Sequence, residues 1–176
     1  MADYTIEQPI VSDAEELIAM HSQSWIDTYP NEEHGITLDH VQGRIDQFTS
    51  DEGYEKRRNY IREGLENPDY YLRIARNIKG KIVGFVDARR GKEGIELCGM
   101  YVDKSEHGKG VALLLAKGAM QWLGDEADVI LNVVIYNKRA QAFYQKLGFE
   151  IIPDSVHFHN NTVIPVINMI RKGEKQ

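Results

Sequence analysis

The sequence contains little cysteine, little proline and a deficit of positive charge. Of its 176 residues, one is cysteine (Cys98) and five are proline. A single cysteine can form neither an internal disulfide nor a paired-thiolate metal site, which favours a reducing compartment. The formal net charge of −6 at pH 7 disfavours non-specific binding to nucleic acid, so no nucleic-acid partner is expected.

The sequence also lacks a long hydrophobic run. Every apolar stretch is far shorter than the roughly 18 residues of a membrane-spanning helix. The first residues, Met1–Glu7, have neither the basic start nor the apolar stretch of a signal peptide. We therefore expect a cytoplasmic protein with no membrane partner. Hydrophobic residues make up 42% and charged residues 27%, as in a globular protein, and the length suits one domain spanning residues 1–176.

The first part of the chain reads as one strand followed by helices. A strand is expected over Tyr4–Val11, and helical spacing or helix-favouring residues follow at 13–29, 37–48 and 51–65. The triplet Lys56-Arg57-Arg58 is interpreted as part of a solvated helix face.

The rest of the chain alternates strands and helices. Strands are expected at 70–77, 82–89, 95–102, 129–135, 149–152 and 162–170, and helices at 108–123 and 137–147. Gly99 indicates a bulge, and the apolar run Val129–Ile135 indicates a central strand covered on both faces. This order predicts one α/β (α+β) domain with about seven strands, mostly antiparallel, and helices on both faces. The crossover from Ile95 to Ile135 should join a parallel pair.

A glycine-containing segment, Tyr101-Val102-Asp103-Lys104-Ser105-Glu106-His107-Gly108-Lys109-Gly110-Val111-Ala112, joins a strand to a helix. The first N–H groups of a helix are unpaired, and glycines let an anion approach them. Lys109, and His107 if protonated, would add charge. A P-loop motif is absent, and a Rossmann fingerprint fails because Leu113 stands at its third glycine. A plain turn before a helix remains the alternative.

A second segment, Asn137-Lys138-Arg139-Ala140-Gln141-Ala142-Phe143-Tyr144-Gln145-Lys146-Leu147-Gly148-Phe149, follows the apolar strand. Asn137 is placed to cap the helix, and Tyr144 lies two helical turns later on the same face. Both side chains could therefore face one cleft, or could serve only as a cap and a half-buried tyrosine.

These two segments resemble the signature of the GNAT acetyltransferase superfamily. The family's pyrophosphate loop has the form [R/Q]-x-x-G-x-[G/A], and its later segment has the form N-x-x-A-x-x-[F/L]-Y-x-K-x-G-F. The first is similar to residues 107–112, with His107 in place of Arg or Gln, and the second matches residues 137–149. The spacing and element order agree over nearly the whole chain. A further stretch, residues 24–29, faintly resembles the spermine/spermidine acetyltransferase-like branch.

The resemblance implies an enzyme that moves the acetyl group of acetyl-CoA to an amine, with a splayed parallel pair of strands around the cosubstrate. The implied CoA-binding residues are Met100, Tyr101, Val102, His107, Gly108, Lys109, Gly110, Val111, Ala112, Leu113, Asn137 and Tyr144. Tyr144 would protonate the departing thiolate, and Glu96 would act as the base. Asp87 is a second candidate base, and no metal is expected.

The acceptor is less well defined by the sequence. Trp25 and Tyr29 lie near Glu32 and Glu33, and aromatic rings beside acids would suit a cationic amine or a polyamine. Cys98 as a ping-pong nucleophile is the alternative to direct attack, although a small buried strand residue explains it as well. A CoA sensor without turnover, a different acyl group and a homodimer also remain open.

Overall fold

The computed structural model describes residues 4–92, 94–159 and 162–174. One sheet of eight strands runs through these residues in the order β1-β2-β3-β4-β5-β8-β6, and β7 also pairs with β8. The strands are β1 (Tyr4–Glu7), β2 (Tyr70–Asn77), β3 (Ile82–Gly91), β4 (Gly94–Val102), β5 (Val129–Val134), β6 (Glu150–Ile151), β7 (His157–Phe158) and β8 (Pro165–Arg171). The predicted α/β fold with a mostly antiparallel sheet is confirmed, and the two-residue β7 is the strand that the sequence pattern missed.

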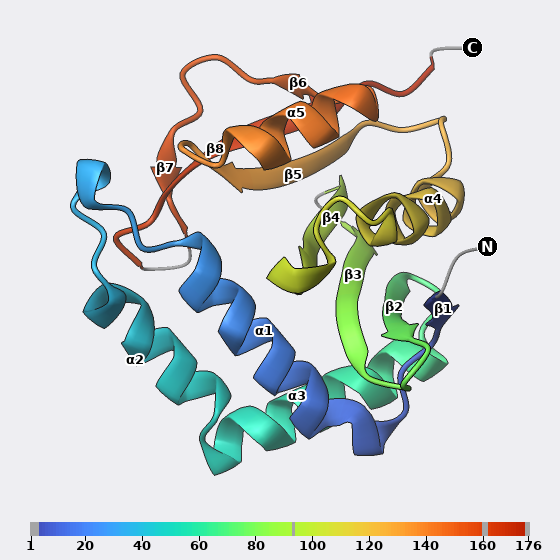
Figure 1. Cartoon of the computed structure of the whole chain (residues 1–176). Helices are drawn as coiled ribbons and strands as arrows, with labels where there is room; N and C mark the ends of the chain where they lie inside the picture. The colour runs from blue at the N-terminus through green and yellow to red at the C-terminus, as the bar shows by residue number, and fades with distance from the viewer. Residues whose placement is uncertain (1–3, 93, 160–161, 175–176) are drawn as a thin grey trace.

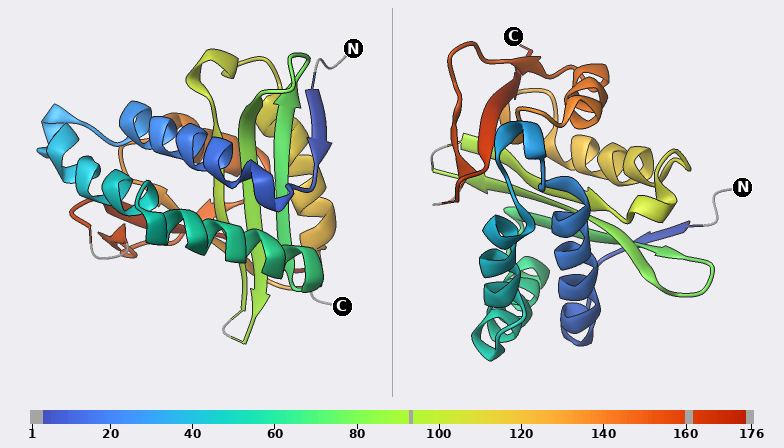
Figure 2. Two further views of the ribbon diagram at one scale, coloured as in Figure 1. Left: turned by 90° about the horizontal axis from the view of Figure 1, so that it is seen from below. Right: turned by 60° about the vertical axis from the view of Figure 1, so that its left-hand side comes forward.

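Helices cover both faces of the sheet, as predicted (Figures 1 and 2). They are α1 (Ala14–Thr28), α2 (Leu38–Phe48), α3 (Asp51–Glu66), α4 (Val111–Leu123) and α5 (Lys138–Lys146). On one face Leu17 of α1 packs with Phe85 of β3. On the other face Leu115 of α4 packs with Val86. Figure 2 shows α1, α2 and α3 on one side of the sheet, and α4 and α5 on the other.

The parallel pair β4–β5 is short. Only Ile95 with Val129, and Glu96 with Ile130, are partnered, and α4 forms the crossover between the two strands. Beyond Glu96 the facing edges of β4 and β5 are not paired with each other, so the sheet opens in its middle. This divergence creates the site described below.

A bulge in β4 lies just before that opening. The register between β3 and β4 runs from Asp87–Gly99 to Ala88–Leu97, which leaves Cys98 without a partner. The bulge predicted from Gly99 is therefore present, with Cys98 as its extra residue. Because one inserted residue reverses the alternation, Glu96 and Met100 fall on opposite faces.

The structure corrects three of the expected strand and helix boundaries and the expected burial of β5. The first strand ends at Glu7 rather than Val11, and α4 begins at Val111 rather than Gly108. The closing strand begins at Pro165 rather than at residue 162. The expectation that β5 is covered on both faces is wrong, because Ile130 is 39% exposed.

Gly84 allows α4 to pack closely on the sheet. A Cβ at this position would lie 2.9 Å from the Tyr101 carbonyl oxygen and 3.1 Å from Leu115 Cδ1. We expect Gly84→Ala to lower the free energy of unfolding by about 1–3 kcal/mol, because the strand and helix must move apart. Denaturant unfolding measures this change. Gly43→Ala on α2 is the control, since its Cβ meets nothing within 4 Å and it should stabilise the helix. Equal unfolding midpoints for Gly84→Ala and the unchanged chain would contradict the argument.

Candidate active site

A cavity of about 420 Å³ lies where β4 and β5 diverge. Its walls are residues 97–102 of β4 and residues 132–134 of β5. At one end are the loop 106–113 and the start of α5. The other end, called the acceptor end here, is formed by Ser24, Tyr29, Cys98, Tyr101 and His159. The cavity therefore joins an exposed helix start to a pocket beneath α1.

The loop end has unpaired N–H groups. Gly108 and Gly110 adopt φ values of +80° and +90°, which favour glycine, and a Cβ on either would meet nothing within 4 Å. The first hydrogen bond within α4 runs from Leu114 N–H to the Gly110 carbonyl. The amides of residues 111–113 therefore have no partner within the helix, and no acidic residue lies in its first turn. This arrangement suits a phosphate group.

Lys109 does not supply its charge to the cavity. Its Nζ lies 3.1 Å from Glu106 Oε2, and the Tyr4 hydroxyl donates to the same carboxylate at 2.6 Å. Lys109 is also absent from the cavity lining. The lysine therefore neutralises Glu106, the carboxylate that lines the loop end.

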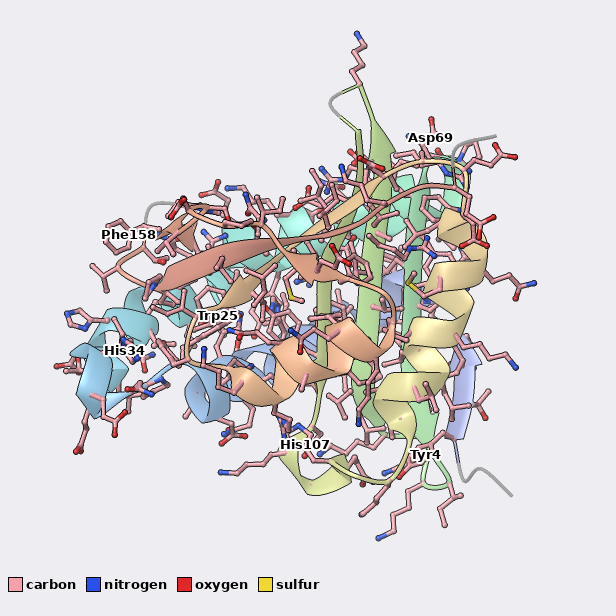
Figure 3. The ribbon with its side chains drawn as sticks, turned by 90° about the horizontal axis from the view of Figure 1, so that it is seen from above. Tyr4, Trp25, His34, Asp69, His107 and Phe158 are labelled. Carbon is pink, nitrogen blue, oxygen red and sulfur yellow. The ribbon has the colours of Figure 1, made fainter. Side chains whose placement is uncertain are left out.

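His107 stands in place of the arginine or glutamine of the motif, in the loop between β4 and α4 (Figure 3). Its Nε2 lies 3.0 Å from the Val102 carbonyl, which can only accept, so Nε2 carries the proton. Its Nδ1 faces the Arg139 guanidinium, which can only donate, so Nδ1 is the acceptor. The imidazole is therefore neutral, and burial together with Arg139 lowers its pKa. The positive charge at this end comes from Arg139, which the sequence interpretation did not single out.

The neutral state of His107 gives a pH prediction. A lowered pKa means that the contact with Arg139 persists at neutral pH and is lost only as acid protonates the ring. We expect the KM for acetyl-CoA to stay constant from about pH 8 to 6.5 and to rise only at lower pH, where the protonated ring repels the Arg139 guanidinium and displaces it from the pyrophosphate, a loss larger than the gain from the charge on His107. His107→Gln keeps one donor and one acceptor but does not titrate, so it should remove the His107 contribution to this acid rise. Initial rates across pH measure both proteins, and identical acid limbs would rule out His107 as the titrating group.

Asn137 and Tyr144 both line the cavity. Asn137 Oδ1 accepts the Ala140 N–H at 3.1 Å, so it is the α5 cap, and its Nδ2 remains as a donor. Tyr144 is 7% exposed and its ring packs against Phe143 and Phe149. Burial, with a smaller effect of Tyr101, raises the pKa of Tyr144, so its hydroxyl keeps its proton.

The candidate bases do not line the cavity. Glu96 is exposed and lies on the face of β4 opposite Met100. Asp87 accepts the Tyr60 hydroxyl at 2.5 Å, and burial raises the pKa of its carboxyl. Cys98 does line the cavity, but burial and the nearby acids Asp87 and Glu96 raise the pKa of its thiol, which disfavours a thiolate nucleophile.

The predicted acceptor residues separate in the structure. Tyr29 lines the cavity, and its hydroxyl lies 2.7 Å from that of Tyr101. Trp25 is 2% exposed and does not line the cavity, although its ring packs against that of Tyr29. Glu32 and Glu33 are exposed and lie outside the cavity lining. The cationic acceptor site expected from aromatic rings beside these acids is therefore not assembled here.

This geometry is that of an acyltransferase, and the chain belongs to the acetyltransferase (GNAT) family, whose model matches residues 21–149. An uncharacterised N-acetyltransferase of Mycobacterium tuberculosis is 29% identical over 144 residues, covering 80% of this chain and 85% of that protein.

Two solved structures show the same fold. PaiA N-acetyltransferase of Thermoplasma acidophilum, in complex with coenzyme A, has a TM-score of 0.76 and 22% identity, covering 96% of this chain and 98% of that one. A variant of spermidine N-acetyltransferase SpeG from Vibrio cholerae has a TM-score of 0.65 and 13% identity, covering 97% and 94%. At these identities the likeness is one of fold alone.

None of the helices described is both long and apolar enough to cross a bilayer. Within the same described residues, no group of three or more His, Cys, Asp or Glu side chains could hold a metal ion.

Proposed function

We propose that this chain, as one domain in the cytoplasm, transfers the acetyl group of acetyl-CoA to an amine by direct attack in a ternary complex. The observation that carries the proposal is the cavity itself, which connects the unpaired amides of α4 to the Tyr144 hydroxyl and the acceptor end. A long thiol carrier with phosphates at one end and a thioester at the other has the shape and charge that this cavity fits.

The chain's own residues supply the binding groups. The amides of residues 111–113 and the Arg139 guanidinium hold the pyrophosphate, and Asn137 Nδ2 donates to the pantetheine arm. The edge of β4 beyond Glu96, which β5 leaves unpaired, hydrogen-bonds the same arm as an added strand would. Together these contacts direct the thioester toward Tyr144.

The chemistry is one of positioning and hydrogen bonding. A backbone N–H near Met100 donates to the oxyanion that forms when the amine attacks the thioester carbonyl. Tyr144 donates to the sulfur as the bond to the thiol breaks. No carboxylate lines the acceptor end among the described residues, so Glu96 stays a predicted base that would need water to reach the amine.

Release of free thiol in the presence of acetyl-CoA and a panel of amines tests the proposal. We expect release that depends on both substrates, together with calorimetric binding of CoA alone. Binding without release from any amine would overturn the proposed activity and favour a CoA sensor. Faster release from propionyl-CoA than from acetyl-CoA would overturn the choice of acyl group.

A further inference from the structure

His159 lines the acceptor end of the cavity from the segment that follows β7. The residue is half-buried, and hydrogen bonds on both sides hold its backbone in place. Its N–H donates to the Ile164 carbonyl at 3.0 Å. Its carbonyl accepts the Thr162 N–H at 2.8 Å and the Thr162 hydroxyl at 2.6 Å. The imidazole is therefore presented to the cavity from a fixed point of the backbone.

A buried aromatic layer lies behind the His159 ring. The ring centroid is 6.1 Å from that of Trp25, which in turn contacts Phe48 at 5.4 Å. The Trp25 indole N–H donates to His21 Nε2 at 3.0 Å, and Arg57 Nη2 lies 3.2 Å from His21 Nδ1. The interpretation of Lys56-Arg57-Arg58 as a solvated face is therefore wrong for Arg57, which faces inward from α3. This packed layer forms a rigid support for the imidazole at the cavity wall.

The other polar side chains of the acceptor end are not bases. The Ser24 hydroxyl donates to the Met20 carbonyl at 3.0 Å. The hydroxyls of Tyr29 and Tyr101 lie 2.7 Å apart, and burial raises the pKa of both, so each keeps its proton. Burial likewise raises the pKa of the Cys98 thiol. Among the described residues that form this end, the imidazole is therefore the group that takes up a proton near neutral pH.

The groups packed around His159 favour its neutral form. Burial has the largest effect and lowers the pKa of the ring. Arg44 of α2 and His157 of β7 lower it further, because a second positive charge nearby is unfavourable. Tyr29 of α1 and Tyr101 of β4 are uncharged at neutral pH. The ring is therefore neutral at pH 7 and can accept a proton there.

We infer that His159 is the general base, which accepts the proton of the acceptor amine as the nitrogen attacks the thioester. The inference rests on the proposed function and names a catalytic residue of the same site. Glu96, the base expected from the sequence, would act only through water, whereas His159 stands at the cavity wall where the amine must lie. General base catalysis requires such direct reach, or a single bridging water.

The proton transfers balance as follows. The lone pair of the neutral amine forms the new N–C bond, the carbonyl π electrons move to oxygen, and His159 takes a proton from the nitrogen. This nitrogen carries a positive charge after attack and is far more acidic than the free ammonium, so a weakly basic imidazole suffices. The oxyanion then re-forms the carbonyl, and the electrons of the C–S bond leave with sulfur, which receives the Tyr144 proton. Water takes the proton from His159 and returns one to Tyr144.

His159→Gln tests the role, because it keeps a polar side chain that cannot take up a proton. We expect kcat to fall about 100-fold or more, with the KM for acetyl-CoA and the dissociation constant of CoA within about threefold. His157→Gln is the matched control, since His157 is exposed, lies outside the cavity lining and has its Nδ1 2.9 Å from the Ser155 carbonyl. It should keep its turnover. Added imidazole should raise the turnover of His159→Ala about 10-fold, measured as acetylated amine, and leave the unchanged chain unaffected.

The pH dependence separates catalysis from packing. The ratio of kcat between the unchanged chain and His159→Gln should be constant above about pH 6.5 and fall at lower pH, because only the unchanged chain loses a base there. Ionisation of the amine cancels in this ratio. In an Arg44→Gln background the fall should move to higher pH, because removal of the guanidinium lets the pKa of His159 rise.

Three results would contradict the inference while leaving the acyltransferase activity in place. They are full turnover by His159→Gln, a kcat ratio that stays constant down to about pH 5, and no effect of imidazole on His159→Ala. If calorimetry shows that neither His159 variant folds, the acid limb of kcat is compared between the unchanged chain and Arg44→Gln with one amine. A limb that does not move to higher pH in Arg44→Gln would then overturn the inference. No turnover of any amine by the unchanged chain would overturn the proposed function and this inference with it.

Discussion

Tyr144→Phe should lower kcat by about 100- to 10,000-fold while leaving the affinity for CoA nearly unchanged. The substitution removes one hydroxyl and keeps the ring that packs against Phe143 and Phe149. No described residue forms a hydrogen bond with this hydroxyl, so its loss breaks no contact inside the folded protein. Its effect should therefore fall on the step in which charge develops on sulfur.

The direction of the pKa shift sharpens this expectation. Burial raises the pKa of Tyr144, so the phenol remains protonated throughout the neutral and moderately alkaline range. A donor that does not ionise there adds no alkaline fall to the rate. Wild-type kcat should then show no loss that can be assigned to Tyr144 below about pH 10.

Rates and binding must be measured together to check it. Thiol release gives kcat, and calorimetry gives the CoA dissociation constant of the same preparations. Tyr71→Phe is the control, because Tyr71 is equally buried but belongs to the core between β2 and α4. If Tyr144→Phe retained full turnover, or lost turnover and CoA binding in parallel, the hydroxyl would have no place in the leaving-group step.

How much of the fold could be predicted from the sequence depends on whether the signal for each helix or strand lies within or next to that element in the sequence. The α5 helix was placed to within a residue at each end because Asn137 and Gly148 are adjacent to it in sequence. β7 pairs through only two residues with a strand later in the chain, and nothing within His157–Phe158 indicates that partner. The alternation of buried and exposed residues along β5 could not be predicted from the sequence, because Ile130 is apolar although it is exposed.

Residues of the cavity lining were identified from the sequence where a local backbone feature marks them, and Arg139 was overlooked because its contact joins distant segments. Gly108 and Gly110 stand out as glycines before a helix, whereas the contact between His107 and Arg139 joins two separate segments. One signal could have identified Arg139, since a cation in the first turn of a helix opposes the helix dipole and suggests a functional constraint. Glu96 could not be placed, because Gly99 indicates a bulge but not which residue is inserted, and only the strand register shows that Cys98 is the extra residue and that the faces are reversed.

The second large effect is expected from substitution of Gly110, the residue directly before α4. Gly110→Ala should raise the KM for acetyl-CoA by about 100-fold. Gly110 has φ of +90°, where an L-residue loses roughly 1–2 kcal/mol relative to glycine. Gly110 directly precedes residues 111–113, whose amides we propose hold the pyrophosphate, so its backbone conformation sets the direction of these amides. Alanine relieves the strain by moving residue 110 out of this conformation, which turns the amides away from the phosphate and weakens binding.

Gly80→Ala separates these two effects. Gly80 has φ of +78° in the turn between β2 and β3, and its Cβ would also meet nothing within 4 Å. It therefore carries the same kind of backbone strain at a position outside the cavity lining. We expect both variants to lose similar stability in thermal unfolding, and only Gly110→Ala to lose acetyl-CoA affinity in rate and calorimetric measurements. If Gly110→Ala bound CoA as tightly as Gly80→Ala does, the start of α4 could not be the phosphate site, because a change of the backbone at residue 110 must alter the direction of the first amides of the helix.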